Sequence, residues 1–61
     1  MIHEKYQRGT DEFAYIEQVG ADNYVMRVVK GDRQIKQMTF SSAVLDVCRK
    51  TIERSGGRRV E

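Results

Sequence analysis

Apolar and polar residues alternate along the first two thirds of the chain, a pattern typical of β-strands that bury one face. The alternation runs through three segments: "FAYIEQV" (13–19), "YVMRVVK" (24–30) and "RQIKQMTF" (33–40). The turn-forming sequences Gly-Ala-Asp-Asn and Gly-Asp separate them, and a Gly-first pair suits a tight hairpin turn. The pattern predicts three consecutive antiparallel strands.

The period changes after the third segment. In "AVLDVCRKTIER" (43–54) the apolar residues recur at helical spacing and form one stripe. The stripe consists of Val44, Leu45, Cys48 and Ile52. Ser41 or Ser42 can cap the start of this helix, because a short hydroxyl side chain accepts a hydrogen bond from a free first-turn amide. Gly56-Gly57 is expected to end it as a left-handed cap.

The predicted fold class is therefore α+β: a three-stranded antiparallel β-meander followed by one C-terminal α-helix packed on one sheet face. Residues 1–12 are polar without a clear period and are expected to form a flexible N-terminal arm. Residues 13–57 form the βββα domain, and residues 58–61 form a basic tail. One helix covers one face of a sheet, so the other face meets solvent, a second copy or a ligand.

A tight turn at Gly31-Asp32 would place Arg27 directly opposite Lys36. Like charges opposite each other in a sheet are mildly destabilising. Three explanations are open: a nucleic-acid phosphate relieves the repulsion, acidic groups of a partner protein do so, or both side chains extend into water. The same register places four apolar residues on the face that the helix leaves open, as a predicted interface: Ile16, Val25, Val29 and Met38.

With 61 residues the chain forms one domain with a small core, because a chain of this size buries only ~60% of the surface that it exposes when unfolded. A single cysteine excludes an internal disulfide. Oligomerisation is the remaining common stabiliser, so we expect a homodimer or a monomer that depends on a partner. The lack of an apolar run of ~20 residues argues against a membrane partner, and the absence of disulfides favours the cytoplasm.

Positive charge is concentrated in the second part of the chain. Residues 1–24 hold two basic and five acidic residues, for a net charge of −3, whereas residues 25–61 hold nine basic and four acidic residues, for a net charge of +5. A basic segment suggests an anionic partner, here nucleic acid, with DNA preferred to RNA. The candidate nucleic-acid-binding residues are Arg27, Lys30, Arg33, Lys36, Arg58 and Arg59. A solvated mixed surface is the alternative.

The sequence gives little sign of catalysis, a cofactor or a metal site. The one histidine, His3, lies in the predicted arm, and Cys48 lies on the apolar stripe, where a small buried hydrophobe is expected. Tyr6, Tyr15 and Tyr24 could stack on bases, as aromatic residues do in single-strand binders. In the predicted register, however, Tyr15 and Tyr24 face the helix, which favours core packing.

The segment "TFSSA" (39–43) joins the third predicted strand to the helix. Three strands followed by such a helix resemble the arm-binding domains of phage integrases and the plant ethylene-response-factor domain. The same order is similar to the single-strand-binding domain of the transcriptional positive-cofactor family, in which SLxxxxW leads into the helix; "TFSSAVL" occupies that place here without the Trp. The resemblance covers residues 13–56 and implies DNA binding through the sheet and, in the last family, dimerisation. It carries over no base contacts, since the Arg- and Trp-rich strands of the plant domain are absent.

The sequence thus predicts a small nucleic-acid-binding protein, not an enzyme, that contacts phosphates through its basic hairpin and open sheet face. The alternative is a protein-binding module of phage or plasmid type that inhibits or regulates a host protein through the same face. A purely structural subunit would share that interface without affinity for nucleic acid.

Overall fold

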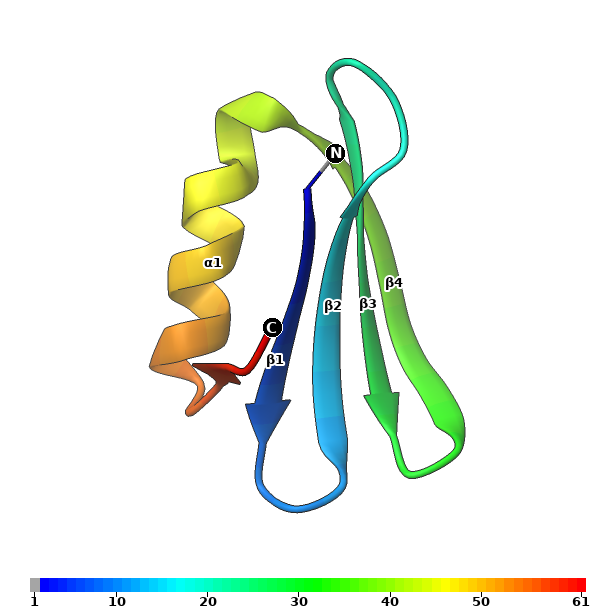
Figure 1. Cartoon of the computed structure of the whole chain (residues 1–61), viewed down its shortest axis with the longest axis vertical. Helices are drawn as coiled ribbons and strands as arrows, with labels where there is room; N and C mark the ends of the chain where they lie inside the picture. Colours follow the sequence, from blue (N-terminus) through cyan, green and yellow to red (C-terminus); the bar gives the residue numbers. More distant parts are fainter. Residues whose placement is uncertain (1) are drawn as a thin grey trace.

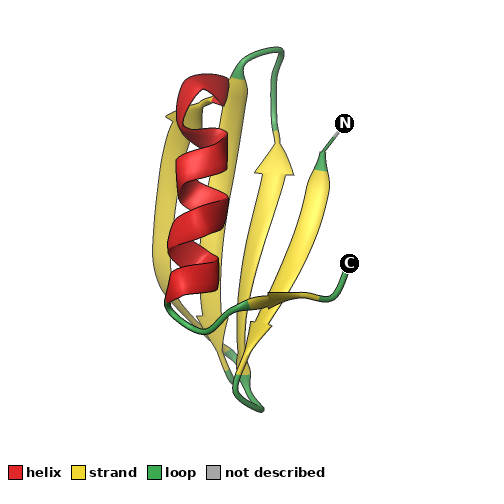
Figure 2. Ribbon diagram, turned by 90° about the vertical axis from the view of Figure 1, so that its left-hand side faces the viewer, coloured by secondary structure: helices red, strands yellow, loops and turns green. Residues whose placement is uncertain are grey.

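The computed structural model describes residues 2–61, which form one antiparallel sheet and one helix (Figure 1). The elements in chain order are β1 (His3–Arg8), β2 (Glu12–Gln18), β3 (Asn23–Lys30), β4 (Arg33–Ser41), a 3-10 turn (Ser42–Val44), α1 (Leu45–Arg54) and β5 (Arg58–Arg59). The strand order in the sheet is β4-β3-β2-β1-β5. Helix α1 lies across one face of the sheet, which we call the helix face (Figure 2). No helix within residues 2–61 is long and apolar enough to cross a membrane.

The predicted three-stranded meander is wrong, because the sheet has five strands. Half of the predicted arm is β1, which pairs with β2 from His3 to Arg8. Met1 lies outside the described residues. Two residues of the predicted basic tail form β5, which pairs with β1. The apolar alternation that marks the other strands is missing from β1, because the residues flanking Tyr6 on the helix face are Glu4 and Arg8.

Strand β2 presents the opposite face to that predicted. Gln18 pairs with Tyr24, so an odd number of residues (19–23) lies between the paired positions, whereas the prediction assumed an even number. A change of one residue exchanges the two faces of a strand. Ile16 therefore faces the helix and is fully buried (0% exposed), and Tyr15 lies on the other face, opposite Arg27.

A β-bulge changes the register of the β3–β4 hairpin. Ile35 is the extra residue, and beyond it Lys36 lies opposite Val28, while Arg27 lies opposite Gln37. The predicted pair of Arg27 and Lys36 is therefore wrong. Because a bulge places one added residue in one strand, Lys36 moves to the helix face and Arg27 stays on the opposite face. The two cations no longer meet.

The core lies between the helix face and the apolar stripe of α1. Its buried apolar residues are Tyr6, Ile16, Tyr24, Met26, Leu45, Cys48 and Ile52. The predicted burial of Cys48 is confirmed, and its Sγ lies 3.3 Å from Sδ of Met26. Val44, predicted on the stripe, is 42% exposed because it precedes the α-helix in the 3-10 turn.

The glycine signals are confirmed, but the serine cap is not. Gly31 (φ 63°) occupies the hairpin turn, and Gly56 (φ 98°) ends α1 with its N–H bonded to the Glu53 carbonyl at 3.0 Å. At the other end, Ser41 makes no capping bond from its side chain. Instead the Oδ1 of Asp22, in the β2–β3 loop, accepts a bond from the Ser42 amide at 3.0 Å. A side chain distant in sequence thus holds the start of the helical segment.

Candidate nucleic-acid interface

The sheet face opposite α1 has no covering element within residues 2–61, and we call it the open face (Figure 1). Strand alternation and the observed pairing determine which side chains it carries. These residues are His3, Lys5, Gln7, Phe13, Tyr15, Glu17, Val25, Arg27, Val29, Gln34, Gln37, Thr39 and Arg58. The face combines aromatic, cationic and amide side chains, the groups that single-strand binders use.

Two aromatic residues occupy the centre of the open face. Phe13 and Tyr15 lie two residues apart on β2, the middle strand of the five, and both are partly exposed. The Nζ of Lys5, on the neighbouring strand β1, lies 4.6 Å from the ring centroid of Phe13 and 5.9 Å from that of Tyr15. Sequence reasoning placed Tyr15 in the core, because it assumed the wrong face for β2.

Cations flank these rings on both sides. Arg27 on β3 lies directly opposite Tyr15 and forms an ion pair with Glu17. Lys5 lies 3.7 Å from Glu61, and this contact contributes little because the Glu61 side chain is exposed to solvent. Arg58 lies beside Gln7 at the sheet edge and makes no ion pair within residues 2–61. The hollow beside Tyr15 and Arg27 is shallow, with a volume of about 260 Å³.

The bulge places two glutamine side chains of β4 on the open face. Gln34 precedes the bulge and Gln37 follows it, and the Nε2 of Gln34 donates a hydrogen bond to the Oε1 of Gln37 at 2.9 Å. Without the extra residue between them, side chains three positions apart on a strand would point to opposite faces. Glutamine amides can donate to and accept from base edges.

The six predicted nucleic-acid-binding residues do not form one cluster. Arg27 and Arg58 lie on the open face. Lys30 and Arg33 lie opposite each other at the tip of the β3–β4 hairpin. Lys36 points toward the helix, and Arg59, opposite Tyr6, lies 3.9 Å from the Glu4 carboxylate. These six positions remain predictions, and the structure divides them between the two faces.

The four predicted interface residues are divided in the same way. Val25 and Val29 lie on the open face and are partly buried. Ile16 was assigned to an interface incorrectly, since it lies in the core. Met38 faces the helix side, opposite Met26, and is 40% exposed at the edge of the sheet. The register errors in β2 and β4 account for both displacements.

A buried carboxylate that the sequence did not reveal joins β1 to the helix. Glu4 is 3% exposed. Its carboxylate accepts hydrogen bonds from the Tyr6 hydroxyl at 2.8 Å and from Nε of Arg49 at 3.0 Å, and it also pairs with Nη2 of Arg49. The bond from Arg49 holds the pKa of Glu4 below its usual value, and burial together with Glu4 raises the pKa of Tyr6 to about 12. This cluster has a structural role, since its groups satisfy one another.

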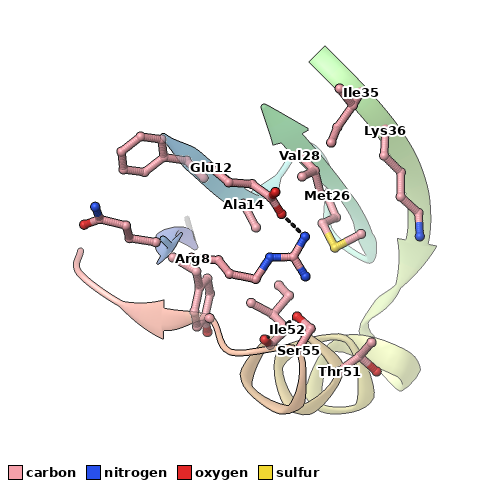
Figure 3. A pocket seen from close by; sticks show the side chains of 14 residues that line it. Arg8, Glu12, Ala14, Met26, Val28, Ile35, Lys36, Thr51, Ile52 and Ser55 are labelled. Atoms are coloured by element: carbon pink, nitrogen blue, oxygen red, sulfur yellow. Dashed lines mark hydrogen bonds and ion pairs between the residues drawn. The ribbon is translucent and has the colours of Figure 1, made fainter. Parts of the chain in front are cut away.

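A groove of about 330 Å³ lies between the sheet and the C-terminal half of α1 (Figure 3). Arg8 projects into its centre and pairs with Glu12. Lys36 and Ile35, from β4, and Thr51, from α1, line the side next to the sheet edge. Glu12 neutralises Arg8, which leaves Lys36 as the other cation that lines the groove. The open face carries three Lys or Arg residues, so the groove is a weaker candidate for an anion.

No protein-family model, curated protein or solved structure matches the chain. The resemblance to DNA-binding domains of three strands and a helix therefore stays a prediction, and the fold itself has two strands more than that design.

Proposed function

We propose that the protein binds single-stranded nucleic acid, with DNA as the first target to test, on its open face. The observation that supports this proposal is the pair of partly exposed rings, Phe13 and Tyr15, at the centre of an uncovered sheet with Lys5 and Arg27 on the neighbouring strands. Every base has a π-face, so aromatic side chains bind single strands without reading sequence.

The spacing of the two rings favours a single strand over a duplex. Residues two apart on a strand are separated by about 7 Å, roughly twice the 3.4 Å rise per nucleotide of one strand in duplex DNA. Bases that stack on Phe13 and Tyr15 would therefore have to be unstacked from each other. An extended single strand allows this arrangement, and a paired helix does not.

The cations provide contacts to the phosphates. Arg27 already has a partner in Glu17, so a phosphate would share the guanidinium, whose several N–H groups can donate to two acceptors at once. Among the residues that the structure describes, Lys5 pairs only with Glu61 and Arg58 makes no ion pair, so each could neutralise a phosphate. Such contacts give affinity and salt dependence but no sequence specificity.

We would test the proposal by fluorescence anisotropy with a labelled dT oligonucleotide of about 12 nucleotides, within the usual ~4–16-nucleotide sites. Phe13→Leu and Tyr15→Leu keep an apolar side chain but remove the ring, and each should weaken binding about tenfold, because stacking contributes ~1–3 kcal/mol per base. Phe40→Leu is the matched control: this ring lies on the helix face, 5.7 Å from Tyr24, and its loss should leave affinity unchanged.

The salt dependence tests the cations separately. Arg27→Gln should reduce the slope of log K against log salt by about 0.7, the value for one phosphate contact to a single strand. Arg54→Gln is the control: Arg54 lies at the end of α1, makes no ion pair within residues 2–61, and should leave the slope unchanged when replaced. Wild-type protein that fails to bind at ~0.15 M salt, or ring variants that bind as tightly as wild type, would contradict the proposal.

A protein partner is the alternative function, and the half-buried valines Val25 and Val29 favour it. If they form the centre of a protein interface, the wild type will have negligible affinity for nucleic acid. Val25→Lys would then abolish capture of the partner, whereas the nucleic-acid proposal expects that substitution to leave DNA binding intact or stronger.

A further inference from the structure

Strand β4 forms a long edge of the sheet and has no neighbour on its outer side within the described residues 2–61. It has nine residues, eight of them exposed, and within residues 2–61 it pairs with β3 alone. Along an edge strand every second residue directs its N–H and C=O groups outward, unpaired, and such an edge readily pairs with another strand. A Lys and a bulge are present in β4, but the five residues after Lys36 continue as regular strand.

The other edge of the sheet is covered. β5 pairs with β1 at Tyr6 and Gln7. Beyond it, the Val60 amide donates to the Lys5 carbonyl at 2.8 Å, and the Lys5 amide donates to the Glu61 carbonyl at 3.1 Å. The chain therefore protects one edge with its own C-terminal segment and leaves the β4 edge available.

Exposed apolar side chains lie beside the available edge. Ile35 (53% exposed) and Met38 belong to β4, and Val44 and Val47 (61% exposed) belong to the adjoining turn and helix. The two valines lie on the same flank of the helix as Thr51, at i, i+3 and i+7. That flank faces β4, because Thr51 lines the groove next to Lys36 (Figure 3), whereas Arg49 on the other flank reaches β1.

We propose that two copies of the chain pair antiparallel through β4 and form a continuous sheet with both helices on the same side. A two-fold axis normal to the sheet places both helices on the same side of the joined sheet. The helix flank that carries Val44 and Val47 then faces the same flank of the second copy. Contacts of this isologous kind are the commonest in homodimers. Two chains that pair through this edge bury apolar side chains and unpaired backbone groups at the same time.

Charge supports a second copy as the occupant. The greatest overlap of the nine-residue strand places the axis at Gln37, the midpoint of Arg33–Ser41. In that register Lys36 faces Met38 of the second copy, and Arg33 faces Ser41 of the second copy. In this register no like charges lie opposite each other. The two cations of β4, Arg33 and Lys36, each face an uncharged residue of the second copy. The open faces of the two copies become one surface.

This inference does not rest on nucleic-acid binding, and a measurement of mass without ligand tests it. Sedimentation equilibrium at micromolar concentration should give twice the chain mass. Val47→Glu should shift the protein to monomer, because it replaces an apolar contact of the proposed interface with a carboxylate from each copy. Met38→Lys should do the same, because it places a second cation opposite Lys36 of the other copy. Val60→Glu is the matched control: Val60 is 42% exposed but lies at the other edge of the sheet, beside β1, and the variant should stay dimeric.

A cross-link locates the interface. In a Cys48→Ala background, Gln37→Cys should oxidise to a disulfide-linked dimer, because residues opposite each other across an antiparallel pair have Cα atoms ~4.5–5.5 Å apart, within disulfide range. Gln34→Cys is the control, since two copies of that residue would be about 20 Å apart. A wild-type monomer, or equal cross-linking of the two variants, would overturn the proposal. So would a dimer that Val25→Glu dissociates and Val47→Glu does not, which would move the interface to the open face.

Discussion

Glu4 shows how one residue can determine whether a segment belongs to the fold. Its carboxylate is buried and bonded to Tyr6 and Arg49, so β1 and α1 are joined by charge as well as by apolar contact. From the sequence alone, a Glu in a polar segment indicates a solvated arm. Only the long-range partner, 45 positions away, makes its burial favourable.

Glu4→Gln should therefore lower the free energy of unfolding by about 1–3 kcal/mol at neutral pH, the cost of an incompletely satisfied buried group. Urea unfolding monitored by circular dichroism measures this value. Glu53→Gln is the control, because Glu53 on the helix surface makes no ion pair within residues 2–61 and should change stability little. If Glu4→Gln were as stable as that control, the ion pair would not hold β1 on the helix.

The same carboxylate predicts a dependence of stability on pH. The pKa of Glu4 in the folded state is below its usual value of 4.5, so the stability that its charge contributes is fully present above that value and is lost as the pH falls through the lower folded-state pKa. Between pH ~5 and pH ~2, the wild type should lose more unfolding free energy than Glu4→Gln. Parallel curves for the two proteins would assign the acid sensitivity to other carboxylates.

At the scale of elements, local signals predicted well what depends on neighbouring residues. The helix stripe, the Gly31 turn and the Gly56 cap all follow from short spacings. Two single-residue shifts, the odd β2–β3 connection and the bulge at Ile35, then exchanged the faces of β2 and β4. Neither shift has a clear sequence signal. The first moved Ile16 into the core, and the second moved Lys36 and Met38 to the helix face.

Strand β1 gives the sharpest test at this scale. Because its residues pair with β2 on one side and with β5 on the other, amides such as that of Tyr6 should exchange with solvent as slowly as amides in the middle of β3. The amide of Ala21, in the β2–β3 loop, should exchange rapidly and serves as the control. Rapid exchange throughout residues 3–8 would restore the flexible arm that the sequence predicted.

At the scale of the whole molecule, one sheet face forms the core with the helix, and the other sheet face is proposed to bind the ligand. The helix buries the core residues of one face, which leaves Phe13 and Tyr15 free to meet a ligand on the other. A dimer through β4 would extend that surface across two chains without covering it. The central claim is therefore that ligand contact occurs on the open face.

The most direct test is an NMR titration of the protein with a short dT oligonucleotide, observed at the aromatic ring protons. Stacked bases shift the signals of rings that they cover, so the Phe13 and Tyr15 resonances should move progressively with added DNA. The Tyr24 and Phe40 rings, stacked on each other on the helix face, should stay in place. Shifts confined to Tyr24 and Phe40, or no ring shifts at a DNA concentration that saturates binding, would contradict the account.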